Sequence, residues 1–281
     1  MRIDAHHHLW SLARGDYGWL TPALAAIYRD FDLADLAPHV SAARIDGTIL
    51  VQAAPTEAET MFLLDIAEKA ELVRGVVGWI DFDAADAVAR IDALAARKLL
   101  VGLRPVVQDI EDDDWLLGSG LALPLAAMAR NSLVFDALVL PRHLPRLLRV
   151  IGRHPDLQFV LDHCAKPPIA TGEITAWKRD VTSLAQYPNI VCKLSGLVTE
   201  AAPEWQVADL RPVVDHVVAC FGPQRLLWGS DWPVVNLAGG YANWSAAAET
   251  LLADLSPNEK ADIFGGNAAR IYLSSRGRRA G

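Results

Sequence analysis

Three histidines follow the first apolar residues of the chain, in the stretch IDAHHHLW at residues 3–10. Imidazole is a common zinc ligand and a general acid or base near neutral pH. Because side chains alternate along a β-strand, His6 and His8 are expected on one side of the strand while His7 points away. A purification tag is a longer run outside the fold, whereas these histidines continue into an apolar strand. The pair His6 and His8 is therefore a candidate for chemistry.

Two further residues suited to the same chemistry end other apolar runs. His163 ends FVLDH, and Asp231 ends LLWGSD. A buried carboxylate between histidines can have its basicity tuned, as a general base requires, so Asp231 is the expected acceptor of a proton from water. The imidazoles can polarise a carbonyl group or hold a divalent ion. The alternative for Asp231 is a helix cap or a salt-bridge partner.

Cationic and aromatic residues near the same strand ends are candidates for binding substrate. Arg104, in VGLRPVV, presents a fork of donors that suits a carboxylate or sugar hydroxyls, unless it forms a salt bridge below the rim. Lys193, in the apolar run IVCKLSG, is expected to donate to substrate or to an oxyanion, unless it points outward between helices. By position alone we add Gln52, Trp79, Trp10, Lys166, Ser195 and Trp232. The acidic stretch EDDDW at 111–115 is expected to form a solvated loop over the mouth of the pocket, without a catalytic role.

These candidates lie at the ends of eight short apolar runs that alternate with helix-forming stretches. The runs cover residues 2–6, 47–53, 73–81, 100–107, 133–140, 158–163, 190–196 and 226–231. Helical spacing is clear at 56–71, where Thr56 and Glu59 suggest a capping box, and at 84–97, 120–131, 142–153 and 205–221. Alternation of this kind predicts a single (β/α)8 TIM barrel, with catalytic residues at the carboxyl ends of its strands. An open doubly wound sheet is the alternative.

The boundaries follow from the same pattern. We expect one barrel domain over residues 1–274, with a C-terminal helical extension from about 241, and a flexible basic tail at 275–281. No linker rich in Gly, Ser or Pro divides the chain.

Composition restricts the class of partner. Of the 281 residues 52% are hydrophobic, which is enough for a large core, and the net charge of −8 disfavours binding to nucleic acid. The sequence lacks a signal peptide and an apolar run long enough to span a bilayer, so we expect a cytoplasmic protein with a small-molecule substrate and no membrane association. Cys164, Cys192 and Cys220 lack metal-site spacing and are expected to be buried and reduced.

Eight segments, taken in order, resemble one enzyme family. They are IDAHHHLW, VQAAPTEAET, GWIDF, VGLRPVVQ, FVLDHCAKP, IVCKLSGL, LLWGSDWPV and NAARIY. Together they look like the lactonase branch of the amidohydrolase superfamily, over residues 3 to about 273. The resemblance implies hydrolysis of sugar-acid lactones, such as those of fuconate and rhamnonate, or of a pyrone dicarboxylate lactone. It also implies catalytic roles for Asp231, His6, His8 and His163.

The metal content is left open by the sequence. Metal-dependent relatives commonly add a lysine or glutamate at the fourth strand or a histidine at the fifth, but this chain has Arg104 and the run LVFDALV there. Arginine cannot ligate a cation, which disfavours a two-metal site. One zinc ion held by His6, His8 and Asp231 and a reaction without metal both remain open, and no organic cofactor is expected.

The favoured interpretation is an enzyme that opens an aldonolactone by attack of water activated by Asp231. One alternative is a zinc-dependent decarboxylase or hydratase on the same scaffold, which would be expected to use the missing fifth-strand histidine. The other is a non-catalytic binding barrel, which would not be expected to retain the aspartate and all three histidines. Many barrels of this kind pair, so a homodimer is a further open expectation.

Overall fold

Eight parallel strands form one sheet whose order follows the chain from β1 to β8. This computed structural model describes residues 1–274, so the tail expected at 275–281 lies outside the described residues. Each strand overlaps a run predicted from the sequence. The strands are β1 (Ile3–His7), β2 (Gly47–Val51), β3 (Val73–Gly78), β4 (Leu100–Leu103), β5 (Val134–Ala137), β6 (Phe159–Leu161), β7 (Ile190–Leu194) and β8 (Leu226–Trp228).

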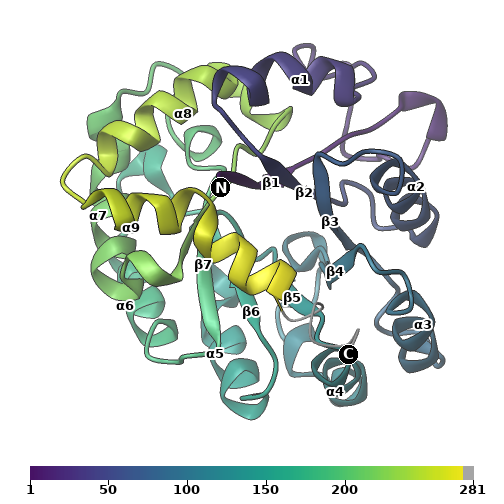
Figure 1. Cartoon of the computed structure of the whole chain (residues 1–281). Coiled ribbons are helices and arrows are strands. Elements are labelled where there is room, and N and C mark those ends of the chain that lie inside the picture. Colours follow the sequence, from purple (N-terminus) through teal and green to yellow (C-terminus); the bar gives the residue numbers. More distant parts are fainter. Residues whose placement is uncertain (275–281) are drawn as a thin grey trace.

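The sheet closes between its last and first strands. The amide of His8 donates to the carbonyl of Trp232 at 2.7 Å, and the amide of Asp231 donates to the carbonyl of His6 at 2.8 Å. Figure 1 shows the resulting ring of strands with helices outside it. The (β/α)8 barrel is therefore confirmed over the open sheet, and its closing seam joins the two chain segments that carry the histidine pair and the aspartate.

Helices follow the strands around the outside of the barrel. They are α1 (Leu33–Ala42), α2 (Glu57–Ala67), α3 (Ala87–Leu94), α4 (Ala122–Arg130), α5 (Leu144–Arg153), α6 (Thr175–Leu184), α7 (Val207–Phe221) and α8 (Gly240–Leu251). The expected C-terminal extension continues through α9 (Pro257–Ala261) and two π-helical turns, Asp262–Gly266 and Ala269–Leu273. None of the helices in residues 1–274 is both long and apolar enough to cross a membrane.

The expected capping box at the start of α2 is only half formed. Thr56 accepts a hydrogen bond from the amide of Glu59 at 3.1 Å. The Glu59 carboxylate does not return to Thr56; it accepts from the amides of Ala53 and Ala54 in the loop after β2. Glu59 therefore holds the loop at the carboxyl end of β2, because those buried amides need an acceptor.

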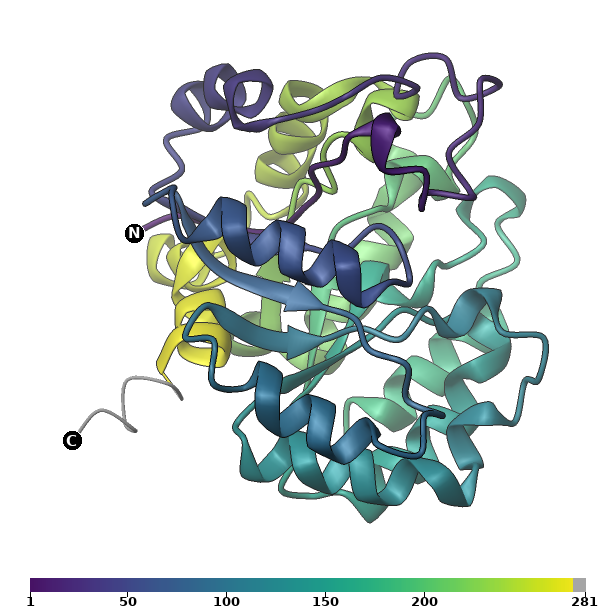
Figure 2. The ribbon, with the colours of Figure 1, turned by 90° about the vertical axis from the view of Figure 1, so that its right-hand side faces the viewer.

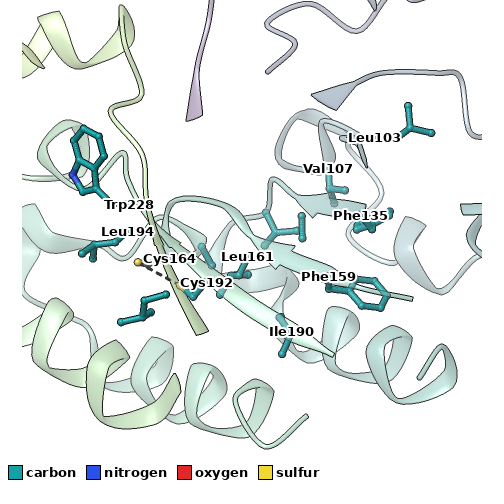
Figure 3. Close-up of a cluster of buried hydrophobic side chains, with 14 of the residues drawn as sticks. Leu103, Val107, Phe135, Phe159, Leu161, Cys164, Ile190, Cys192, Leu194 and Trp228 are labelled. Atoms are coloured by element: carbon teal, nitrogen blue, oxygen red, sulfur yellow. Dashed lines mark hydrogen bonds between the residues drawn. The ribbon is translucent and has the colours of Figure 1, made fainter. Parts of the chain in front are cut away.

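The apolar core has two parts. One part packs the strands against the helices, as Figure 3 shows for side chains from β4 to β8, including the buried thiols of Cys164 and Cys192, which lie 3.6 Å apart. Cys220 is half-buried, and all three cysteines are free, as expected. The other part joins side chains of all eight strands to Ala268, Ile271 and Tyr272 of the C-terminal segment. Figure 2 shows that segment at the end of the barrel where the strands begin. The opposite end is left for a site.

Candidate active site

A cavity of about 220 Å³ opens at the carboxyl ends of the strands. This volume is below the roughly 300–1,000 Å³ of drug-sized sites, and it suits one small ring. Its walls combine polar side chains on several strands with apolar ones. The lining residues are His8, Trp19, Gln52, Ala53, Pro55, Arg104, Val106, Gln108, Asp109, Leu138, His163, Lys166, Gly196, Thr199, Asp231 and Val234.

One carboxylate and three imidazoles converge at this end of the barrel. Asp231 Oδ1 lies 3.4 Å from His8 Nε2, 3.7 Å from His6 Nε2 and 3.9 Å from His163 Nε2. His6 Nε2 and His8 Nε2 are 3.2 Å apart, so the two histidines share a side as expected, whereas His7 turns to Thr48. The three strands β1, β6 and β8 thus bring together the residues that the sequence singled out.

Irregular backbone places these groups. Four consecutive residues from His163 to Lys166 have φ between 50° and 60°, and Asp231 has φ 58°. Left-handed conformations are unfavourable for residues with a Cβ, and they concentrate at functional sites. Gly196 packs against the first of them, since a Cβ at this residue would lie 2.5 Å from His163 Nδ1. This backbone conformation therefore fixes the position of the His163 ring.

Neighbouring groups determine which ring nitrogens are available. His8 Nδ1 lies 2.8 Å from the carbonyl oxygen of Val51, which can only accept, so Nδ1 carries the proton and Nε2 is free to accept or to bind a cation. His163 Nδ1 is 2.9 Å from the hydroxyl of Ser195. The sequence had suggested that Ser195 binds substrate, but Ser195 does not line the cavity; its hydroxyl contacts His163 instead.

Burial lowers the pKa of two of these imidazoles, His6 and His163. It lowers the pKa of His163 to about 4, and burial followed by the nearby charge of Lys193 holds the pKa of His6 well below its usual range. Burial alone would raise the pKa of Asp231, but the surrounding imidazoles, His163 first, outweigh it and lower this pKa well below its usual range. The expected tuning thus produces a firmly ionised carboxylate and not a stronger base.

The donor set fits a single divalent cation. The atoms His6 Nε2, His8 Nε2 and Asp231 Oδ1 are separated by 3.2, 3.4 and 3.7 Å. Tetrahedral ligands at about 2.0–2.1 Å from zinc lie about 3.3–3.4 Å from one another. His6, His163 and Asp231 form a second compact set, with ligand atoms within 4.8 Å. Arg104 Nη1 lies 3.4 Å from His6 Nε2, and its positive charge disfavours a second metal ion at this site.

Lys193 differs from its sequence-based interpretation. Its side chain is fully buried and pairs with Asp136 and Asp162, so it does not line the cavity and has no path to substrate or an oxyanion. Arg104 does line the cavity, and it also forms the alternative salt bridge, with Asp162 Oδ2 at 3.3 Å. A low-dielectric interior makes such pairing necessary for both cations.

Some of the remaining candidate residues line the cavity, and the others lie outside its wall. Gln52 and Lys166 line the cavity. Trp10 and Trp232 are buried and pack edge-to-face on Phe31, outside the cavity wall. Trp79 lines a neighbouring pocket that shares Pro55, Val106 and Asp109 with the cavity; that pocket is lined by Pro55, Trp79, Ile80, Asp81, Phe82, Asp83, Pro105, Val106, Asp109, Ile110 and Trp115.

Sequence reasoning missed Asp136 and Asp162, the partners of the buried cations. Each is fully buried in or directly after an apolar strand, in VFDA and FVLD. The signal that singled out Lys193, a charge inside an apolar run, was present for both. It also missed Trp19, Gln108, Asp109 and Thr199, which reach the cavity from turns and short 3-10 helices between the strands and the α-helices.

Comparison with known proteins gives one consistent family. The amidohydrolase family model matches residues 3–273. An L-fucono-1,5-lactonase of Burkholderia ambifaria is 46% identical over 98% of this chain and 96% of that protein. An L-fucono-1,5-lactonase of Burkholderia multivorans is 35% identical over 97% and 96%. A crystal structure of an amidohydrolase from Burkholderia multivorans with bound zinc superposes with a TM-score of 0.91 at 36% identity, covering 97% of this chain and 99% of that one.

Proposed function

The chain belongs to the amidohydrolase family, and from that premise we propose that it hydrolyses the ester bond of a sugar-acid lactone. The observation that carries the proposal is the contact of one ionised carboxylate with three imidazoles at a cavity sized for a single ring. The two similar L-fucono-1,5-lactonases favour a 1,5-lactone of a deoxy-aldonic acid as substrate, and carbohydrate catabolism as the setting.

Opening the ring requires a nucleophilic water and two proton transfers. Asp231 accepts a proton from the water whose oxygen attacks the lactone carbonyl carbon. The bond to the ring oxygen then breaks, and protonated Asp231 returns the proton to the departing alkoxide. A carboxyl group with a low pKa is a strong acid, so the surroundings of Asp231 favour this second transfer.

Charge that develops on the carbonyl oxygen requires donors that are already in place. Arg104 is the buried cation on the cavity wall, and its contacts with Gln52 and Asp162 fix the guanidinium before substrate binds. Lys166, one quarter exposed and 3.8 Å from Glu200, is suited to hold the carboxylate of the product.

One divalent cation fits the same residues. His6, His8 and Asp231 would hold it, and its chemistry there would be Lewis-acid polarisation of the carbonyl and a lowered pKa of the attacking water. A lower pKa of the water would make the first proton transfer to the weakly basic Asp231 easier.

Acid release tests the proposal. Purified protein is mixed with a panel of five- and six-membered aldonolactones in weak buffer with a pH indicator, with and without a chelator and with added Zn²⁺. We expect acid release well above the spontaneous rate on L-fucono-1,5-lactone. Loss of the rate with chelator and its return with Zn²⁺ would establish the cation as essential. Rates equal to the spontaneous ones across the panel, with Zn²⁺ supplied, would refute a lactonase.

A further inference from the structure

A layer of fully buried charge separates the active site from the apolar end of the barrel. Lys193, Asp136 and Asp162 are each 0% exposed. The ammonium of Lys193 donates to two carboxylates, Asp136 Oδ2 at 2.5 Å and Asp162 Oδ1 at 3.0 Å, and its nitrogen lies 3.3 Å from His6 Nδ1. Two buried carboxylates therefore share one ammonium group.

The C-terminal segment supplies the last member of this layer. Tyr272, which is also fully buried, packs with the inner barrel side chains and directs its hydroxyl to Asp136, 2.9 Å from Oδ1 and 2.8 Å from Oδ2. Its ring centroid lies 5.3 Å from Lys193 Nζ. Asp136 is therefore shared between a tyrosine at the base of the barrel and a lysine that lies next to His6.

Two routes lead from Lys193 to the cavity. Through His6 it reaches His8, whose Nε2 is 3.2 Å from His6 Nε2. Through Asp162 it reaches Arg104, which donates to Asp162 Oδ2 at 3.3 Å. Both routes end on side chains that line the cavity.

We propose that Tyr272 is a positioning residue for catalysis, acting through Asp136 and Lys193 on His6 and Asp162. The inference rests on the proposed function for its kinetic readout. The physical reason is competition for one ammonium group inside the barrel, where unpaired charge is costly and hydrogen bonds are strong. The hydroxyl of Tyr272 donates to Asp136 and so satisfies part of the acceptor capacity of this carboxylate. Without this hydroxyl, the unsatisfied lone pairs of Asp136 compete for the other protons of the Lys193 ammonium and weaken the contacts of Lys193 with Asp162 and His6.

Removal of one hydroxyl tests the proposal. In Tyr272→Phe we expect kcat for lactone hydrolysis to fall about tenfold, since small misplacements of catalytic groups have effects of this size, with KM within about twofold of wild type. The matched control is Ile271→Ala, a buried apolar neighbour in the same segment, which should lower the melting temperature and leave kcat unchanged. If Tyr272→Phe lowers the melting temperature but not kcat, the tyrosine only packs and the proposal is wrong.

Nuclear magnetic resonance of the imidazole nitrogens keeps the proposal testable without turnover. The His6 ring signals, assigned with His6→Gln, should shift in Tyr272→Phe and stay in place in Ile271→Ala. Unchanged His6 signals in Tyr272→Phe would overturn the proposal even for an active lactonase. Shifted signals in a protein that hydrolyses no lactone would uphold the coupling while refuting the proposed function.

Discussion

At the scale of single residues, the chemistry of each imidazole depends on the partner of the ring nitrogen that points away from Asp231. The carbonyl of Val51 fixes the proton of His8 on Nδ1, and Ser195 orients His163. A histidine in a sequence shows neither its tautomer nor its neighbours, because those partners are on other strands. The four converging residues were predictable from strand-end positions. The supporting role of Ser195 and the pairing of Lys193 were not.

The role of Asp231 gives the first prediction. Asp231→Asn keeps the shape of the side chain but removes the proton acceptor, so kcat should fall by at least about 100-fold. The matched control is Asp109→Asn, an exposed carboxylate on the same cavity wall, which should alter KM more than kcat. Steady-state kinetics on the preferred lactone, with circular dichroism to verify folding, would measure both. Wild-type turnover in Asp231→Asn would eliminate the proposed base.

The pH profile gives the second prediction. His163 is neutral in the free enzyme above its pKa of about 4, which burial lowers from 6.5, and Asp231 is ionised throughout the accessible range. We expect kcat/KM to stay level from pH 8 down to about 5.5 and to fall as the pH drops through about 4. Brief assays, with recovery measured at pH 7, would separate titration from unfolding. A fall in kcat/KM near pH 6.5 would instead indicate that the titrating imidazole is exposed to solvent.

At the scale of elements, β1 carries two functions on two faces. Its register against β2 shifts between Asp4 and His7, so Ala5 joins the inner apolar cluster while His6 reaches the polar layer. Strict alternation predicted the shared side of His6 and His8 correctly, yet a register shift has no sequence signature here. His7 is left on the other face, fully buried, with Nε2 2.9 Å from the Thr48 hydroxyl.

His7 makes the third prediction, on stability. Burial, followed by the charge of His8, lowers the pKa of His7 in the folded state to about 3, against 6.5 when it is unfolded. Between these values the unfolded chain binds a proton that the folded chain does not, so stability falls as the pH falls from 6.5 towards 3. His7→Gln removes this titration and can keep a hydrogen bond to Thr48.

Urea unfolding at pH 7 and pH 5 would measure the effect. The loss of unfolding free energy between the two pH values should be smaller in His7→Gln by about 2 kcal/mol, which corresponds to one proton over the interval below pH 6.5. Because His7 turns away from the cavity, kcat at pH 7 should match wild type. An identical loss in both proteins would mean that His7 titrates normally in the folded state.

At the scale of the whole molecule, the barrel was predictable and its closure at the base was not. Eight apolar runs alternating with helical stretches allow few architectures other than a closed barrel. The partners inside it are distant in sequence, with a separation of 57 positions from Asp136 to Lys193 and of 136 positions from Asp136 to Tyr272. The C-terminal extension was expected only as a helical appendage, whereas it covers the barrel and completes its buried charge layer.

The joint between the two chain ends gives the last prediction. Gly265, between α9 and Tyr272, lies against the first residues of the chain, so a Cβ there would be 2.3 Å from the Met1 carbonyl oxygen and 2.9 Å from the Ile3 amide nitrogen. Backbone atoms cannot move aside as a flexible side chain can. Gly265→Ala should therefore lower the unfolding free energy by about 3 kcal/mol, near the upper end of overpacking effects.

Gly18→Ala is the matched control, because no atom beyond its two chain neighbours lies within 4 Å of the added methyl group, and its unfolding free energy should change by less than about 0.5 kcal/mol. Urea denaturation of both variants beside wild type would give the values. Equal stability of Gly265→Ala and wild type would show that the C-terminal segment is not pressed against β1. In that case the segment could not hold Tyr272 firmly enough to position Asp136, so this measurement also tests the premise of the coupling between the base of the barrel and its active site.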